Sequence, residues 1–137
     1  MPGQPTFPGW LVFNVMSLAI SDNIVAAGAP FSVSVTFDGS GSIFEGTASP
    51  PTGLEGTSQP FTANFYAEGI GAGALEIDLG SVPGNLSPAG GPYTATLPVA
   101  GGIGTAGLYR LGCTVTLNNY LDIAGYQEGA LLQIHPV

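Results

Sequence analysis

The 137-residue sequence predicts one all-β sandwich domain. Two segments, residues 31–37 and 108–117, alternate apolar and polar residues with a period of two, which is typical of half-buried β-strands. Shorter alternating segments recur along the chain, and many of the 22 glycines and 12 prolines fall between them, where turns need these residues. No segment has a helical period that competes with this pattern.

The elements follow in chain order. Residues 1–9 form an extended arm, with prolines at every third position from Pro2 to Pro8, which favours a polyproline-like path. The sandwich domain is expected over residues 10–137, and its first strand over residues 10–20. The other strands are expected over residues 31–37, 61–67, 75–79, 93–99, 108–117 and 130–134, which gives about seven strands.

The segment GLYRL at residues 107–111, with CTVTL after it, resembles the second-last strand of an immunoglobulin-like or fibronectin type III domain. In that fold a tyrosine near the start of the strand bonds through its hydroxyl to the backbone a few residues upstream, and the resemblance implies this role for Tyr109. Leu111 stands where the immunoglobulin cysteine would be, so the resemblance is to the cysteine-free architecture. Cys113, the only cysteine, is expected in the core. Such an architecture implies no single function.

Charge excludes several classes of partner. Nine carboxylates against Arg110, the only lysine or arginine, give a formal net charge of −8. Nucleic acids and anionic membranes are bound by clusters of basic residues, so neither is expected as a partner. No apolar run reaches the roughly 18–20 residues of a membrane-spanning helix, so no membrane insertion is expected. No lysine or arginine precedes Trp10, so no signal peptide is predicted; we expect synthesis in the cytoplasm and a location in a virion or at a cell surface.

Several motifs suggest chemistry, but each has a simpler interpretation. Residues 102–107 spell GxGxxG, yet a strand follows instead of the helix that a nucleotide site needs. Glu76 and Asp78 share one side of a strand about 6.6 Å apart, as in a glycosidase, but acids on an outer face are usually just solvated. Residues 38–45 offer oxygen ligands without an EF-hand pattern, and His135 lacks partners for a zinc site or a catalytic triad. We predict no enzyme activity, no metal and no cofactor.

Residues 10–15 are apolar on both strand faces, whereas a sandwich strand normally has one polar face. Either the strand crosses between the sheets or another copy covers its outer face. Together with the proline arm, this pattern predicts a self-association surface that comprises Pro5, Phe7, Trp10, Leu11, Phe13 and Val15. The expected function is a non-enzymatic assembly subunit, as a homo-oligomer or in a larger assembly, such as a capsid decoration or a surface-layer protein.

The alternative is a carbohydrate-binding or adhesion module. The loop expected over residues 118–128 carries aromatic residues beside polar ones. Aromatic rings stack on sugar faces or anchor protein interfaces, and an acid orients hydroxyl groups. The candidate ligand-binding residues are Tyr66, Tyr120, Asp122 and Tyr126, and a glycan is the candidate ligand.

Overall fold

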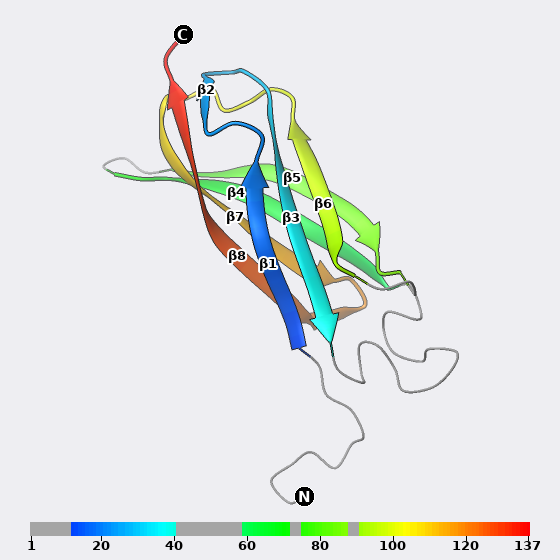
Figure 1. The fold of residues 1–137 in the computed structure, drawn as a ribbon. Coiled ribbons are helices and arrows are strands. Elements are labelled where there is room, and N and C mark those ends of the chain that lie inside the picture. The colour runs from blue at the N-terminus through cyan, green and yellow to red at the C-terminus, as the bar shows by residue number, and fades with distance from the viewer. Residues whose placement is uncertain (1–11, 41–58, 72–74, 88–90) are drawn as a thin grey trace, which may run out of the picture.

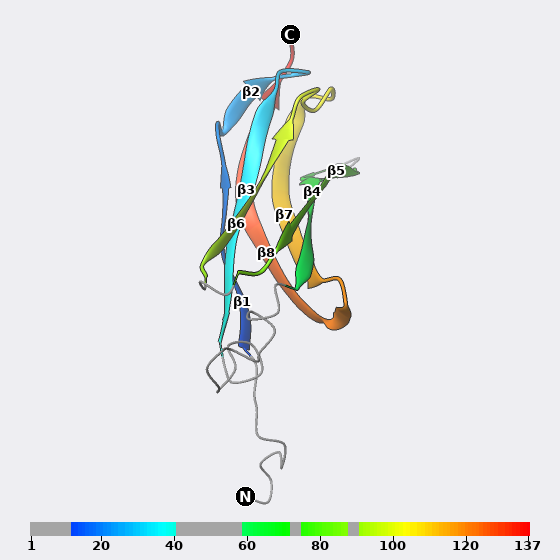
Figure 2. The same ribbon diagram turned by 90° about the vertical axis from the view of Figure 1, so that its right-hand side faces the viewer.

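The computed structural model describes residues 12–40, 59–71, 75–87 and 91–137, and these residues fold into two β-sheets that lie face to face (Figure 1, Figure 2). The first sheet has three strands, in the order β1 (Val12–Ile20), β3 (Phe31–Ser40) and β6 (Tyr93–Val99). The second has five, in the order β2 (Ile24–Ala26), β8 (Tyr120–His135), β7 (Gly107–Leu117), β4 (Pro60–Gly69) and β5 (Glu76–Asn85). The predicted all-β sandwich is confirmed.

The chain passes from one sheet to the other several times. β3 and β4 lie in different sheets, as do β5 and β6, and β6 and β7. Neighbouring strands are antiparallel, except that β2 runs parallel to β8. β3 pairs with β6, and β7 lies between β4 and β8, which is the arrangement of an immunoglobulin-like sandwich.

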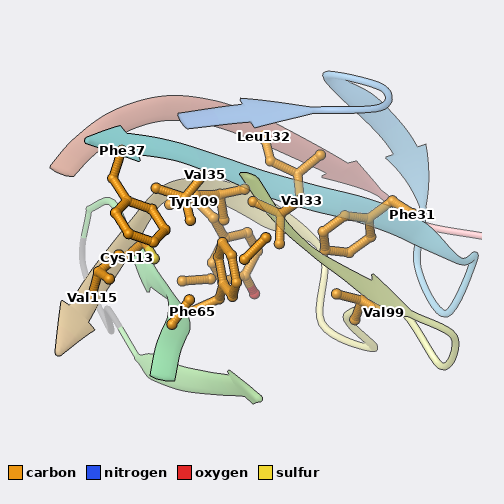
Figure 3. Packing of buried hydrophobic residues seen from close by; sticks show 14 of the residues in the cluster. Phe31, Val33, Val35, Phe37, Phe65, Val99, Tyr109, Cys113, Val115 and Leu132 are labelled. Carbon is orange, nitrogen blue, oxygen red and sulfur yellow. The ribbon is translucent and has the colours of Figure 1, made fainter. Parts of the chain in front are cut away.

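Alternate residues of facing strands fill the space between the sheets. The buried positions of β3 are the predicted ones, Phe31, Val33, Val35 and Phe37. Figure 3 shows these side chains directed toward residues of the opposite sheet, among them Phe65, Tyr109, Cys113 and Val115. The Phe37 ring meets Phe61 edge-on, with ring centroids 4.8 Å apart. No polar or charged side chain among the described residues is buried.

Two sequence-based expectations about β7 are confirmed. The Tyr109 hydroxyl donates a hydrogen bond of 2.8 Å to the backbone carbonyl of Thr105, four residues upstream. This contact is the tyrosine corner that the resemblance implied. Cys113 is a free thiol in the core with no exposed surface, and burial raises its pKa to about 12 because the thiolate loses its hydration there.

A bulge in the first strand changes which of its residues pair with core positions of β3. One extra residue lies in β1 between Val15 and Ser17. Val15 therefore pairs with the buried Phe37, and beyond the bulge Leu18 pairs with the buried Val35. An extra residue in a strand changes which alternate positions face the core. The chain then leaves this sheet and forms β2 at the edge of the other one, a short strand that the sequence did not predict.

The structure corrects the expected end of the chain. The sequence predicts a loop over residues 118–128, but a tight turn at Asn118 and Asn119 leads directly into β8. β8 has 16 residues and includes the expected last strand. The pairing of β8 with β7 shifts register twice, by three residues after Tyr120 and by one residue at Gly129, and the first shift falls where the loop was expected.

The outermost strands of the five-stranded sheet are β5 on one side and β2 on the other. β5 forms one edge and contains Pro83, which has no backbone N–H to donate. The other edge is β2, which has three residues.

Candidate functional site on the outer face of the five-stranded sheet

Side chains on the outer face of this sheet form rows that run across the strands. In the central row, Asp78 of β5 lies opposite Tyr66 of β4, and Tyr66 lies opposite Gly112 of β7. Gly112 in turn lies opposite Glu128 of β8, and an adjacent row includes Thr114 opposite Tyr126. We define the tyrosine face as the side chains of Asn64, Tyr66, Glu76, Asp78, Tyr126 and Glu128.

Tyr66 extends across β7 toward β8. A Cβ atom on Gly112 would collide with the hydroxyl end of the Tyr66 ring, so the ring occupies the space that a side chain would take. Beyond this glycine the ring lies nearly parallel to Tyr126, with an interplanar angle of 19° and ring centroids 6.4 Å apart. A side-chain hydrogen bond joins the two tyrosines. The missing side chain at Gly112 thus allows tyrosines from two non-adjacent strands to meet.

Two bulges flank the central row. Leu79 is an extra residue in β5, immediately after Asp78, and Gly129 is an extra residue in β8, immediately after Glu128. The Asp78 carboxylate accepts a hydrogen bond of 3.0 Å from the backbone N–H of Gly80, and this bond fixes the carboxylate within the central row. Bulges redirect side chains and are over-represented next to functional sites.

A hollow of about 360 Å³ opens beside Tyr66. Its lining residues come from β4 and β5 and are Asn64, Phe65, Tyr66, Glu76 and Asp78. The side chains of Asn64, Glu76 and Asp78 are exposed, so a ligand in the hollow would meet an amide and two carboxylates beside an aromatic ring.

Negative charge surrounds Tyr66. Glu68 is 4.0 Å from Arg110, and both side chains are about half exposed, so this ion pair contributes about 0–1 kcal/mol. Because Arg110 is the only lysine or arginine in the chain, no other such residue exists to neutralise Glu76, Asp78 and Glu128.

The pKa of Tyr66 responds to this charge. Burial raises the pKa of its phenol above the ordinary value, and the hydrogen bond to Tyr126 and the charges of Glu128 and Glu76 raise it further. Tyr66 therefore stays a neutral hydrogen-bond donor throughout the physiological pH range. Carboxylates that disfavour a phenolate would favour a bound cation.

The same sheet face is apolar at the end where β7 begins. We call this group the apolar end; its exposed fractions are 58% for Ile24, 41% for Ile70, 42% for Leu108 and 48% for Leu131. Ile24 and Leu108 both lie opposite Gln133, Ile70 donates a backbone hydrogen bond to Leu108, and Leu131 lies opposite Arg110. The apolar end therefore occupies two adjacent rows.

The structure brings together two of the four predicted ligand-binding residues. Tyr66 and Tyr126 are in contact, whereas Tyr120 lies at the start of β8, opposite Leu117. Tyr126 lies opposite Thr114, three residues along β7 from Leu117, so the strand positions of Tyr120 and Tyr126 are about 10 Å apart along β7. The side chains of Tyr120 and Asp122 lie outside the described part of the structure.

The predicted self-association residues are largely outside the described residues. These are Pro5, Phe7, Trp10 and Leu11. The backbone of Phe13 and Val15 is described, and its register places them opposite Gly39 and Phe37 of β3.

Sequence inspection missed the apolar end and the roles of Gly112 and Glu128. One signal was present: Leu108 precedes the core residue Tyr109, and Leu131 precedes the core residue Leu132, so each pair puts an apolar residue on both faces of its strand.

The other motifs lie apart from one another. Gly102 is in the connection between β6 and β7, where a Cβ atom would collide with the backbone of Ala29. A glycine is therefore needed here because two loops approach each other closely. In the segment 38–45, Asp38 accepts a hydrogen bond from the backbone N–H of Gly39, and residues 41–45 lie outside the described residues. His135 is exposed at the end of β8. Within the described ranges, no three His, Cys, Asp or Glu side chains group as metal ligands do, and no apolar helix has membrane-spanning length.

Comparison with known proteins adds no family. No protein-family model matches the sequence, and no curated protein matches it. Among solved structures, the CARDB domain of the PF1109 protein from Pyrococcus furiosus, solved in complex with di-metal ions, is similar with a TM-score of 0.48 and 13% identity over 95% of this chain and 97% of that one. A beta-glucosidase from Listeria innocua, solved in complex with gluconolactone, is similar with a TM-score of 0.49 and 12% identity. That match covers 96% of this chain but 17% of the glucosidase.

Proposed function

We propose that the protein is a non-enzymatic assembly subunit that packs on a second copy of itself through the apolar end. The supporting observation is that four large apolar side chains are exposed together on one sheet face. Single exposed apolar residues are ordinary, but a contiguous group of them marks an interaction site. A virion decoration or a surface-layer protein is the kind of subunit that fits this proposal.

The rows at the apolar end suit a twofold contact. A twofold interface is self-complementary, so Leu108 and Leu131 of the two copies would cover one another. The row of Leu131 also contains Arg110, Glu68 and Glu76, and the twofold contact would place Arg110 of one copy near the carboxylates of the other. Each copy has a formal charge of −8, so screening by added salt is expected to strengthen the association.

Light scattering at several protein concentrations tests this proposal. We expect the wild-type chain to form a stable oligomer and the double variant Leu108→Ser, Leu131→Ser to be a monomer. Val137→Ser is the matched control, because it makes the same kind of change at a fully exposed apolar residue at the C-terminus. A wild-type chain that is monomeric at every concentration, or a double variant that assembles normally, would overturn the proposal.

A second candidate is a carbohydrate-binding or adhesion module, favoured by the contact between Tyr66 and Tyr126 beside the hollow. Near-parallel rings on a surface offer stacking faces to a sugar. Glycan binding that is lost in Tyr126→Ala, in a chain that remains monomeric, would support this candidate over the assembly subunit. Wild-type affinity in Tyr126→Ala would remove it.

A further inference from the structure

We propose that the tyrosine face binds lysine or arginine side chains of a basic polypeptide. One cationic group would lie between the Tyr66 ring and the carboxylates of Asp78 and Glu76, and the polypeptide would continue over Tyr126 and Glu128 of β8. This inference goes beyond the proposed self-assembly, because it concerns the tyrosine face and a partner that is not a second copy; Glu76 lies in the same row as Leu131, and the other residues of the tyrosine face lie in other rows.

The aromatic part of the site is preorganised for a cation. An ammonium or guanidinium group is attracted to the face of an aromatic ring within about 6 Å of its centre. Tyr126 is 55% exposed, so its ring is accessible, and Tyr66 is held over Gly112 by the hydrogen bond to Tyr126. A ring that is already fixed loses little conformational entropy when a ligand binds.

The carboxylates supply the charge complementarity. Asp78 is fixed by the Gly80 N–H and lines the hollow together with Glu76, and Glu128 lies opposite Gly112 on the other side of the Tyr66 ring. These acids therefore flank the ring from both sides. Charge-assisted hydrogen bonds from a lysine or arginine to a carboxylate are roughly twice as strong as neutral ones.

The partner must come from elsewhere. The chain has no lysine, and its only arginine, Arg110, already lies beside Glu68 on the same face. A second copy therefore has no unpaired lysine or arginine to offer. A neutral sugar would satisfy the rings but would leave three carboxylates without a cation. A basic polypeptide satisfies both, and the net charge of −8 would attract it over long range.

Titration of the full chain with a defined probe tests the inference. The probe is an acetylated hexalysine peptide, and its control is the same peptide with every lysine side chain acetylated. We expect hexalysine to bind with an affinity that falls as salt is added, whereas self-association is expected to strengthen with salt. The control peptide, in which every lysine side chain is acetylated, should not bind.

Matched variants locate the binding. Asp78→Asn keeps an oxygen that accepts the Gly80 hydrogen bond, so the fold should persist, and we expect at least a tenfold loss of affinity. Tyr126→Ala should cost a similar factor, whereas Tyr66→Phe, which keeps the ring, should cost less. Asp22→Asn is the control: it removes the same charge from an exposed position between β1 and β2.

Three outcomes would overturn the inference. The first is no binding of hexalysine at low salt. The second is an equal loss of affinity in Asp22→Asn and Asp78→Asn, because binding would then follow overall charge and not this face. The third is binding of neutral or amino-sugar oligosaccharides in preference to hexalysine. None of these results depends on whether the wild-type chain forms an oligomer, so the proposed assembly would stand or fall separately.

Discussion

Two aromatic rings of β4 lie over glycines of neighbouring strands, one on each face of the same sheet. On the inner face, a Cβ atom on Gly84 of β5 would collide with the ring of Phe61, which is buried against Phe37. On the outer face, a Cβ atom on Gly112 of β7 would collide with Tyr66, which is half-buried. The same backbone feature thus packs a core ring on one side of the sheet and positions a surface ring on the other.

The first prediction separates the two rings by stability. Phe61→Ala leaves a cavity next to Phe37 and should lower the free energy of unfolding by about 3–5 kcal/mol. Tyr66→Ala should lower it by about 0.5–1 kcal/mol, because solvent can fill the space above the sheet. Urea denaturation of both variants measures the difference. Equal losses would mean that Tyr66 contributes to the fold as Phe61 does, and that the outer face is not a separate region.

The second prediction separates the two glycines. Gly84→Ala forces a methyl group toward a ring enclosed by the core, so we expect a loss of about 1–3 kcal/mol in the free energy of unfolding. In Gly112→Ala the exposed end of Tyr66 can swing away, so the loss should stay within about 0.5 kcal/mol.

Gly112→Ala should nevertheless change Tyr66. Displacement from Tyr126 removes the hydrogen bond that helps to raise the pKa of the Tyr66 phenol, so this pKa should move down toward its ordinary value. Ultraviolet absorbance of the phenolate during an alkaline titration, compared with Tyr66→Phe, identifies the contribution of this residue. An unchanged titration would show that the ring keeps its position despite the added methyl group.

The third prediction uses pH to test the burial of Cys113 on the inner face. The pKa of Cys113 is raised to about 12 in the folded chain from an ordinary value of 9.0, so the folded state holds its proton while the unfolded state loses it. Stability from this group is complete below pH 9 and should then fall by about 1 kcal/mol per pH unit as the pH rises toward 12. Cys113→Ala should remove this slope, and thermal unfolding at several alkaline pH values compares the two chains. Identical slopes would show that the thiol titrates as in the unfolded chain.

The inner face was predictable from the sequence, whereas on the outer face the sequence indicated single residues such as Tyr66, Tyr126, Glu76 and Asp78 but not which of them meet. Alternation over residues 108–117 places Tyr109 and Cys113 in the core, because burial on one face imposes a period of two. The contact between Tyr66 and Tyr126 depends on the pairing of strands that are far apart in the sequence and on a bulge at Gly129. A shift of one residue in the register would move either ring to the other face, and no local pattern in the sequence determines that register.

The edges of the five-stranded sheet bear on how copies can accumulate. An open edge with free backbone donors and acceptors can add strands from other molecules without limit and so grow into fibres. In this sheet one edge strand carries Pro83, and on the other side β2 covers only residues 133–135 of β8. Strand addition is therefore discouraged along β5 and at the end of β8 that β2 covers. Among the described residues no strand pairs with residues 120–132 of β8 on that side, so this stretch is where a strand from another copy could add.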